Sequence, residues 1–416
     1  MRDMYPQLCP QPYSETIFAS RDTVRSGKEK LGSKVMTLHF LFSFLRRTKR
    51  ARIVPIVLAA CACSPSGTSH SATESEVETP TYSHLFDTRN TPDGVLVTTY
   101  QPADTTKILK RYLLYKGEQA PGDLAKDIVA IRIPLENVAA AHATQIGLID
   151  ALGYSDRIKS IGSKAALEAR SALAARDDLD EFFNGWQFDT EKLLALSPDA
   201  VFFSPGRTED VAMLEKNVRA PLLYDLSPWE THPLARTEWL KFTSEFFDCR
   251  QKADSLFAEI EKRYLSVRQQ AQEHHSHPKV LSSLPYQGIW YMPAGGSYKG
   301  VLFREAALDF PWEDTAETGS LPLDLETVLA KAHDADVWFF EAGMGSCPTL
   351  ASLKAQNKLY ERFKAFRQGD IFVCDTDRAP YFEQSIVHPD WVLSDFTRLP
   401  REKDYVPYYY NRIEAQ

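Results

Sequence analysis

The pattern of apolar and polar residues changes at about Val95. From there to the C-terminus, short apolar runs alternate with amphipathic segments, as in α/β proteins. The runs predict strands in two groups. The first group is Val95–Tyr100, Arg111–Tyr115, Ile128–Ile133, Val138–Ala141, Val201–Phe203 and Leu222–Tyr224, and the second is Val280–Leu284, Trp290–Met292, Val337–Phe340 and Ile371–Cys374.

One long helical segment separates the two groups of strands. From Arg236 to about Gln272, apolar residues such as Leu240, Leu256 and Ile260 recur at helical spacing, and no proline or glycine interrupts them. At 1.5 Å per residue such a helix is about 50 Å long, which is enough to run between two lobes. The pattern therefore predicts a first lobe, a connecting helix and a second lobe.

An internal repeat predicts that the two lobes share one plan. The segment Phe188–Ala195 corresponds to Leu323–Ala330, with Asp, Glu, Leu and Ala matched at one offset. Asp199 or Asp334 follows each copy, and a strongly apolar run comes next. We expect each unit to be a short helix that leads into a central strand, once per lobe.

Composition and charge exclude some classes of protein. The 416 residues carry a formal net charge of -8, with a pI near 5.8. A sequence-independent nucleic-acid binder would show a basic face, so we expect no nucleic-acid partner. No run of eighteen apolar residues is present, so any membrane attachment has to come from another signal.

That signal lies near the N-terminus. A basic cluster at 46–52 precedes the apolar run Ile53–Ala60, and Cys61 follows the small residues Ala59 and Ala60. This order resembles a lipoprotein signal, with Cys61 as the lipidated residue. Met36 is then a candidate for the true start. The alternative is a buried segment that ends in cysteine by coincidence.

These patterns together predict the domain organisation. The polar stretch after Cys61 is typical of a flexible tether. The predicted divisions are an export region at 1–60, a lipidated tether at 61–81, an N-terminal α/β lobe at 82–232, a spanning helix at 233–275 and a C-terminal α/β lobe at 276–416.

Several segments resemble the substrate-binding proteins of iron-siderophore and cobalamin ABC importers. The segments that carry the resemblance are Val138–Gly153, Glu191–Phe203, Pro233–Leu240, Gly296–Tyr298 with Arg304–Ala307, Asp324–Phe340 and His388–Leu393. The resemblance implies the class III periplasmic binding protein architecture, in which two Rossmann-like lobes are joined by a single long rigid helix. It also implies a monomer that delivers its ligand to an ABC permease dimer with its ATPase subunits, in the periplasm of a Gram-negative bacterium.

The same resemblance assigns a role to Glu191 and Glu326. In that family an exposed glutamate on each lobe docks into arginine pockets of the permease, and these two residues match that pattern. The alternative is that acidic residues favour the first turn of a helix, with Asp189 and Asp324 as N-caps.

The ligand is expected between the lobes, at loops that follow the carboxyl ends of strands. Aromatic faces there suit a flat ligand, and Arg207 and Arg378 suit an anionic ferric complex. The candidate ligand-binding residues are His142, Thr144, Gln145, Trp186, Arg207, Trp290, Tyr291, Ser297, Tyr298, Glu341, Arg378 and Tyr381. We predict neither catalytic residues nor a protein-held metal or cofactor. The resemblance implies that the ligand is a ferric siderophore, haem or a corrinoid, and the sequence does not separate these three.

Two other functions stay open. One is a chelatase-like enzyme or accessory factor on the same scaffold, for which Cys249, Cys347 and Cys374 are widely spaced. The other is a divalent-metal binding protein, which would need more ligands than His142 and Glu341. A disulfide between Cys347 and Cys374 is a further possibility.

Overall fold

The computed structural model describes residues 77–415, apart from 165, 166, 168–170, 172, 185, 186, 206, 207 and 344–346. The predicted export region, Cys61 and most of the predicted tether lie outside these residues. Among the described residues, no helix has the length and apolar character needed to cross a membrane.

The chain first forms a sheet that the strand pattern only partly predicts. The strands are β1 (Val77–Glu78), β2 (Phe86–Thr91), β3 (Gly94–Gln101), β4 (Asp104–Tyr115) and β5 (Ile128–Arg132), paired in that order. All pairs are antiparallel except β4–β5, which is parallel. The predicted α/β lobe from residue 82 therefore begins with an all-β portion, and its α/β part begins at Val138.

The first lobe is built on a parallel sheet in the order β12-β11-β6-β7-β8. Its strands are β6 (Val138–Ala140), β7 (Ile158–Ile161), β8 (Asp180–Glu181), β11 (Ala200–Phe203) and β12 (Leu222–Tyr224), and its helices are α1 (Ala143–Ala151), α2 (Thr190–Leu196) and α3 (Thr208–Asn217). A small hairpin of β9 (Phe183–Asn184) and β10 (Gln187–Phe188) precedes α2. The residues of β6, β11 and β12 are all buried, as expected for strands covered on both faces.

The second lobe repeats this plan with its own sheets. Strands β13 (Val280–Ser282), β17 (Val337–Ala342) and β18 (Ile371–Asp375) are parallel, and β19 (Tyr410–Arg412) joins them antiparallel. A three-stranded antiparallel sheet consists of β14 (Pro285–Tyr286), β15 (Ile289–Pro293) and β16 (Ser320–Leu323). The helices are α6 (Tyr298–Glu305), α7 (Leu325–Ala332), α8 (Leu350–Gln356), α9 (Lys364–Gln368), α10 (Tyr381–Gln384) and α11 (Pro389–Arg398).

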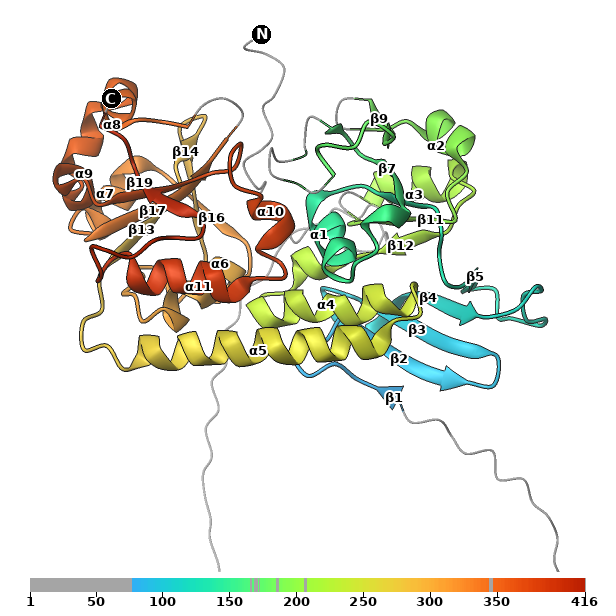
Figure 1. Ribbon diagram of the computed structural model, residues 1–416. Helices are drawn as coiled ribbons and strands as arrows, with labels where there is room; N and C mark the ends of the chain where they lie inside the picture. The colour runs from blue at the N-terminus through green and yellow to red at the C-terminus, as the bar shows by residue number, and fades with distance from the viewer. Residues whose placement is uncertain are drawn as a thin grey trace, which may run out of the picture. The chain divides into compact units, whose positions relative to one another are not determined.

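The predicted spanning helix is wrong as one continuous element, because the segment forms two helices. These are α4 (Pro233–Glu245) and α5 (Arg250–Gln272), which pack side by side (Figure 1). Between them Phe246 and Phe247 are buried, and Asp248 has a positive φ of 55°. The chain can turn here without glycine or proline, because the two phenylalanines are buried and because aspartate tolerates the left-handed region of backbone conformation.

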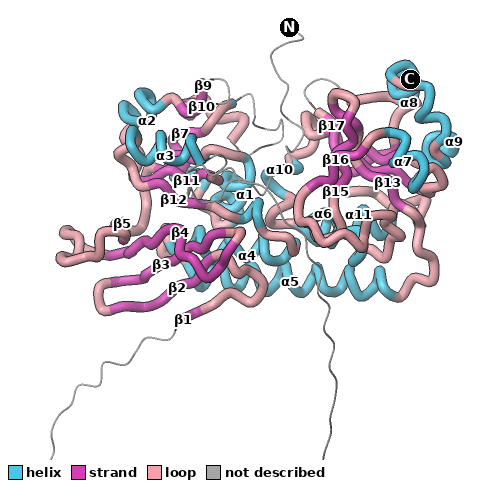
Figure 2. The backbone as a smooth tube through the Cα atoms, turned by 180° about the vertical axis from the view of Figure 1, so that it is seen from behind, coloured by secondary structure: helices cyan, strands magenta, loops and turns pink. Residues whose placement is uncertain are grey.

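Helix α5 alone fulfils the connecting role. At about 35 Å it contributes Ala253 and Ile260 to the first hydrophobic core, and Phe257 and Tyr264 to the second. Figures 1 and 2 both show the sheet β1–β5 beside α4, and Phe86 of β2 packs edge-on against Trp239 of α4. The first core therefore includes the N-terminal sheet, α4 and half of α5.

The last part of the predicted tether is held firmly in the fold. We call residues 77–83 the N-terminal strap. The backbone N–H groups of Thr81, Tyr82 and Ser83 donate hydrogen bonds of 2.8, 2.7 and 3.0 Å to the carboxylate of Glu238 in α4. Glu238 is fully buried, and Lys241 compensates its charge at 2.9 Å. Residues 77–81 were predicted as tether from their polar composition, and the strap's backbone contacts correct that prediction.

A second buried carboxyl group behind the strap is expected to make stability depend on pH. Burial raises the pKa of Glu230 from 4.5 to about 7, even though Ser83 and Trp239 donate hydrogen bonds to it. The folded protein therefore holds a proton that the unfolded chain releases, so this contribution to stability is full below pH 4.5 and is lost as the pH rises through 7.

The variant Glu230→Gln is expected to mimic the protonated form at every pH. Its unfolding free energy, measured by urea denaturation, should equal that of the wild type near pH 4.5 and exceed it by about 3 kcal/mol at pH 8. The exposed Glu259→Gln serves as the control. Parallel pH profiles for wild type and Glu230→Gln would contradict the expectation.

Candidate functional site

The two predicted docking glutamates occupy equivalent places in the two lobes. Glu191 is the second residue of α2 and Glu326 the second residue of α7, and both are exposed. Each helix has the expected N-cap: Asp189 accepts from the N–H of Lys192 at 2.9 Å, and Asp324 from that of Thr327 at 2.6 Å.

The structure changes one detail of the internal repeat. Asp199, directly before β11, accepts hydrogen bonds from the N–H groups of Glu136 and Asn137. The residue directly before β17 that accepts a backbone hydrogen bond in the same way is Asp336, which accepts from the N–H of Lys279 at 2.7 Å. The sequence repeat paired Asp199 with Asp334, but Asp334 instead forms an ion pair with Lys279. The repeat therefore lengthens by two residues between the helix and the strand of the second lobe.

The strand ends of the first lobe present His142 to solvent. His142 is the N-cap of α1, is exposed, and packs edge-on against Phe183, with 6.0 Å between ring centroids. Thr144 beside it is half-buried. The candidate residues Trp186 and Arg207 lie outside the described residues, so their roles stay predictions.

Gln145 supports this edge from within. It is 1% exposed, its Oε1 accepts from the N–H groups of Ala141 and His142, and its Nε2 donates to Ser204 at 3.1 Å. Both ends of the amide are therefore used inside the lobe. In this conformation Gln145 fixes the loops after β6 and β11, and its role as a ligand contact stays a prediction.

In the second lobe, some candidates are buried. Trp290 is fully buried and its indole N–H donates to Ser282 at 2.8 Å. Ser297 is buried as the N-cap of α6. Trp290 alternates along β15 with Tyr291, which is half-buried. Strand periodicity does not say which face is the core, and here the core takes Trp290.

Glu341, at the carboxyl end of β17, is the centre of a polar network. Lys299 of α6 contacts both of its carboxylate oxygens at 2.6 Å, and the hydroxyl of Tyr410 donates to it. The Tyr410 hydroxyl also lies 3.4 Å from that of Tyr381. Burial raises the pKa of Glu341, but the ion pair with Lys299 and the hydrogen bond from Tyr410 outweigh burial and hold it below its ordinary value.

The remaining candidates differ in exposure. The side chain of Arg378 is 81% exposed and lies 3.5 Å from Asp375. Tyr381 is 6% exposed, whereas its neighbour Phe382 is 41% exposed. Tyr298, the first residue of α6, is half-buried. Of the predicted ligand residues in this lobe, Tyr291, Tyr298, Glu341 and Arg378 keep a solvent-accessible side chain.

The two lobes meet along a seam that α1, α4 and α10 form. Figure 1 shows α1 and α10 side by side. A Cβ atom on Gly147 of α1 would lie 1.8 Å from the carbonyl oxygen of Glu383 in α10. Thr237 of α4 donates to the carbonyl of Ile386 at 2.6 Å. The guanidinium carbon of Arg236 lies 4.4 Å from the ring centroid of Tyr298.

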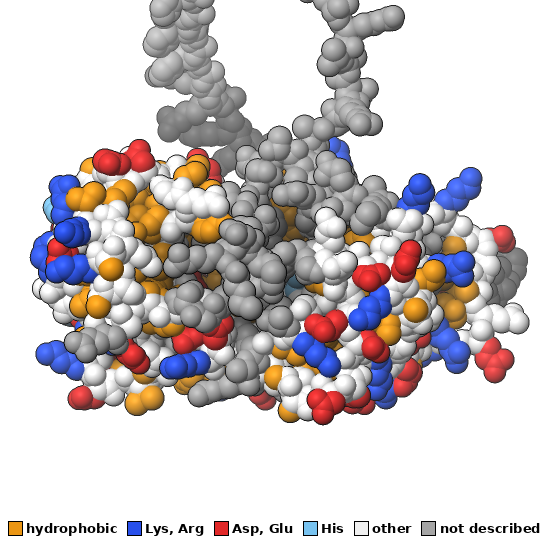
Figure 3. Space-filling view, turned by 90° about the horizontal axis from the view of Figure 1, so that it is seen from above, with side chains coloured by type: hydrophobic (Ala, Val, Ile, Leu, Met, Phe, Trp, Pro, Cys, Tyr) orange, Lys and Arg blue, Asp and Glu red, His pale blue; other side chains and the backbone are white. Residues whose placement is uncertain are grey.

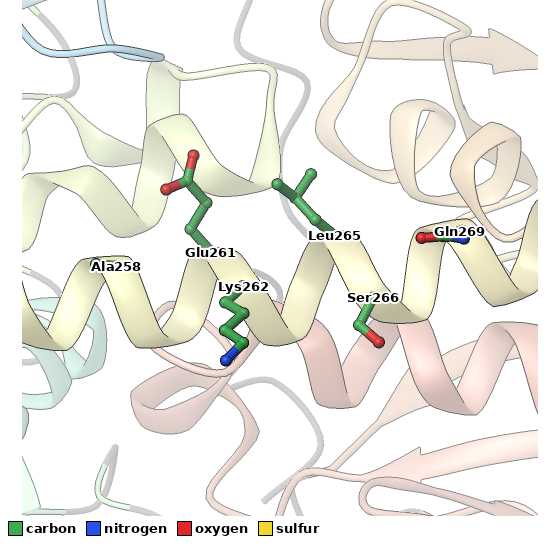
Figure 4. A pocket seen from close by; sticks show the side chains of 6 residues that line it. All are labelled: Ala258, Glu261, Lys262, Leu265, Ser266 and Gln269. Atoms are coloured by element: carbon green, nitrogen blue, oxygen red, sulfur yellow. The ribbon is translucent and has the colours of Figure 1, made fainter.

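Surface depressions do not identify the ligand site. Figure 4 shows a depression of about 410 Å³ whose lining residues, Ala258, Glu261, Lys262, Leu265, Ser266 and Gln269, all come from α5. A second depression lies in the first lobe, around Arg176 and Asp178. Neither is bounded by both lobes, so the candidate site rests on the seam residues.

Metal-ligating side chains do not gather in the described part of the chain. No group of three or more His, Cys, Asp or Glu side chains there has a metal-binding arrangement. Cys347 is exposed and Cys374 is buried, and they do not form a disulfide. The site thus offers phenols, three cations, one carboxylate and an imidazole, which suit binding of a polar, partly aromatic molecule.

Charges of both signs lie on the face seen from above. Figure 3 shows acidic and basic side chains interspersed over the visible described residues of both lobes. A field of one sign that would draw a charged ligand from a distance is therefore not evident on this face.

Sequence reasoning missed three residues of the site: Arg236, Lys299 and Tyr410. Arg236 lies in the segment Pro233–Leu240, which was considered only as the start of a helix. Lys299 directly follows the candidate Tyr298, and Tyr410 belongs to a run of three tyrosines. The available signal was the concentration of polar and aromatic residues where a helix begins or a strand ends.

Two α/β lobes that share one helix, with polar side chains along their seam, define a two-lobe binding protein. The Periplasmic binding protein family matches residues 138–378, more than half of the chain, and the chain belongs to that family. Members are the substrate-binding, non-catalytic components of ABC importers. The N-terminal sheet lies before the matched part.

Related proteins agree with this assignment. An uncharacterized lipoprotein of Methanocaldococcus jannaschii is 28% identical over 291 residues, which are 66% of this chain and 67% of that protein. A second one is 26% identical over 237 residues, 53% of this chain and 58% of its own length. The solved structure of S. aureus IsdE complexed with haem has a TM-score of 0.50 at 14% identity, covering 64% of this chain and 99% of that one. It supports the fold.

The close contact between α1 and α10 predicts that a methyl group added at Gly147 destabilises the fold. Gly147→Ala would place its Cβ against the carbonyl of Glu383, so α1 and α10 would have to move apart. We expect a loss of about 1–3 kcal/mol in unfolding free energy, with a larger radius of gyration in X-ray scattering. Gly122→Ala is the matched control, because a Cβ at Gly122 meets nothing within 4 Å. Equal stability of the two variants would mean that the lobes are not in this close contact.

Proposed function

We propose that the protein captures a metal chelate between its lobes and delivers it to a membrane permease. The chelate is an iron complex, either a siderophore or haem, or a corrinoid. The observation that carries the delivery step is the matched position of Glu191 and Glu326, each exposed on the first turn of an equivalent capped helix. An acidic residue in a first turn is common, but its recurrence at the same place in both lobes favours a shared task.

A permease with two subunits suits this arrangement. Exposed ion pairs contribute little affinity each, but two placed at corresponding points fix orientation and speed the encounter. Glu191 and Glu326 each belong to a different lobe. The permease would therefore bind both glutamates only when the two lobes hold them at the correct distance from each other.

The resemblance and the site's chemistry support the ligand class. The half-buried Tyr291 and Tyr298 offer phenol rings, while Arg236 offers a positive charge that forms no ion pair with a described carboxylate. These groups suit a flat or aromatic chelate that carries anionic edges. The solved structure of S. aureus IsdE holds haem, and we extend that class of ligand to this chain as part of the proposal.

Membrane attachment is the third part of the proposal. Cys61, at the end of a lipoprotein-like signal, would carry the lipid and hold the protein at the periplasmic face of a Gram-negative membrane. The two relatives from Methanocaldococcus jannaschii carry the name lipoprotein, which supports an anchored form.

We expect the lobes to move little on binding. Helix α5 contributes to both cores, and α1, α4 and α10 add direct contacts between the lobes. Large hinge motions would have to break these contacts. The protein would then present nearly one shape to the permease with and without ligand, and recognition would depend on small changes at the seam.

The ligand is tested first by native mass spectrometry and absorbance titration of the purified protein. The probes are ferrioxamine B, a ferric tris-catecholate, haem and cyanocobalamin, each added separately. Binding of one of them at one molecule per chain supports the proposal and identifies the ligand class. Failure of all four would refute the proposed ligand class.

Docking is tested by the double charge reversal Glu191→Arg with Glu326→Arg. Both residues are exposed, so ligand affinity and unfolding temperature should stay unchanged, while uptake of labelled ligand by cells should fall about tenfold or more, since arginine would repel a basic pocket. The exposed pair Glu259→Arg with Glu317→Arg is the control. Normal uptake with Glu191 and Glu326 reversed would remove the docking role.

A further inference from the structure

Arg236 lies at the point where α4 leaves the first lobe and meets the second. Its Nε donates a hydrogen bond of 3.1 Å to the carbonyl of Ser227, which ties it to the first lobe. Its guanidinium plane lies over the ring of Tyr298 in the second lobe, 4.4 Å from the centroid. The neighbouring Thr237 holds the second lobe through Ile386. The position of Arg236 is thus fixed from both sides of the seam.

This arginine has no acidic partner among the described residues. Other partly buried arginines of the same helices are paired: Arg250 with Glu245 at 2.7 Å, and Arg268 with Glu305 at 3.3 Å. Arg236 forms no ion pair within 4.0 Å with a described carboxylate, and its side chain is half-buried. Keeping a charge there without a counter-charge costs free energy, which an anion from outside would recover.

The carboxyl groups near Arg236 form no ion pair with it. Burial raises the pKa of the carboxyl groups of Asp225 and Glu230, although the charge of Arg236 acts to lower both, and neither forms an ion pair with Arg236 within 4.0 Å. Glu341 is already paired with Lys299 and hydrogen-bonded by Tyr410. Arg236 is therefore a cation of the seam with which no described carboxylate forms an ion pair.

The turn before α6 places a helix N-terminus beside Arg236. A Cβ at Gly295 would lie 2.0 Å from the carbonyl oxygen of Glu313, so this turn requires glycine. The turn places Tyr298 at the N-terminus of α6, and Ser297 caps only the N–H of Gly300. The positive end of the helix dipole thus adds to the charge of Arg236. The terminal nitrogens of the guanidinium make no hydrogen bond to a described residue and can bind two oxygens at once.

We infer that Arg236 binds an oxyanion of the ligand, such as a carboxylate, phosphate or catecholate oxygen, and selects anionic chelates over neutral or cationic ones. The inference rests on the proposed function, since it concerns the ligand held between the lobes. Tyr298 forms the surface on which the guanidinium lies, and its hydroxyl has no hydrogen-bond partner among the described residues. Selection takes place at the seam, so the bound anion would contact groups that both lobes hold in place.

The experiment compares Arg236→Gln and Arg236→Lys with the wild type on matched pairs of probes. The pairs are haem and haem dimethyl ester, cyanocobalamin and dicyanocobinamide, and a ferric tris-catecholate and ferrioxamine B. The first member of each pair carries a carboxylate, a phosphate or catecholate oxygens, and the second lacks that group. Dissociation constants come from absorbance titration of the full chain. Arg304→Gln, an exposed arginine at the other end of α6, is the control, and thermal unfolding checks the fold of each variant.

For the pair that the wild type binds, Arg236→Gln should weaken the anionic member about 10- to 100-fold and leave the other member almost unchanged. Arg236→Lys should give an intermediate loss, because it keeps the charge but not the two-pronged geometry. The bound pair also identifies the type of oxyanion. Equal weakening of both members, no weakening, or a wild-type preference for the member that lacks the oxyanion would overturn the inference and leave the proposed function standing. If the wild type binds none of the six probes, the proposed function fails and the inference with it.

Discussion

The fold depends on α5 being buried in two hydrophobic cores at once. Ala253 and Ile260 pack into the first core, and Phe257 and Tyr264, within the same few turns, pack into the second. A helix cannot rotate or slide without disturbing both sets of contacts, because each core is close-packed. The relative position of the strand ends, and with it the polar seam around Arg236 and Glu341, follows from this shared burial.

Two buried carboxylates secure the ends of the described chain in the same manner. Glu238 accepts three backbone hydrogen bonds from the strap. Asp395 of α11 is also fully buried and accepts the N–H groups of Tyr408, Tyr409 and Tyr410, together with the hydroxyl of Tyr405. A carboxylate that satisfies three donors in a row fixes an irregular segment that would otherwise leave buried N–H groups unpaired. The segment that Asp395 fixes contains Tyr410, whose hydroxyl donates a hydrogen bond to Glu341.

Much of the fold could be predicted from the sequence, because its signals are local. Apolar runs gave the parallel strands, and the repeated Asp-x-Glu pattern gave both capped helices with their exposed glutamates. The break between α4 and α5 was not predictable, since Asp248 adopts its left-handed conformation only because Phe246 and Phe247 are buried by distant parts of the chain. The sequence pattern predicted only part of the N-terminal sheet for a related reason. Its short strands gain their stability by packing on α4, which lies far away in the sequence.

The candidate site was harder to predict than the fold. The prediction placed the site at loops that follow strands, but strand alternation could not tell that Trp290 faces the core and Tyr291 the opposite side. Gln145 looked like a ligand contact because it follows a strand, and the structure uses it to hold two loops together. The role of Arg236 could not be predicted from the sequence. It depends on which carboxylates lie near the side chain in the folded protein, and no described carboxylate forms an ion pair with it.

The equivalence of α2 and α7 has a consequence for symmetry. Two lobes of one plan give the molecule an approximate twofold character, so a twofold-symmetric partner could meet the glutamate pair in either of two orientations that are alike at Glu191 and Glu326. The sheet β1–β5 belongs to the first core, whereas the antiparallel sheet of the second lobe has three strands and a different order. The extra sheet makes the first lobe distinguishable from the second, so for a partner that met both glutamates the two orientations would not be equivalent.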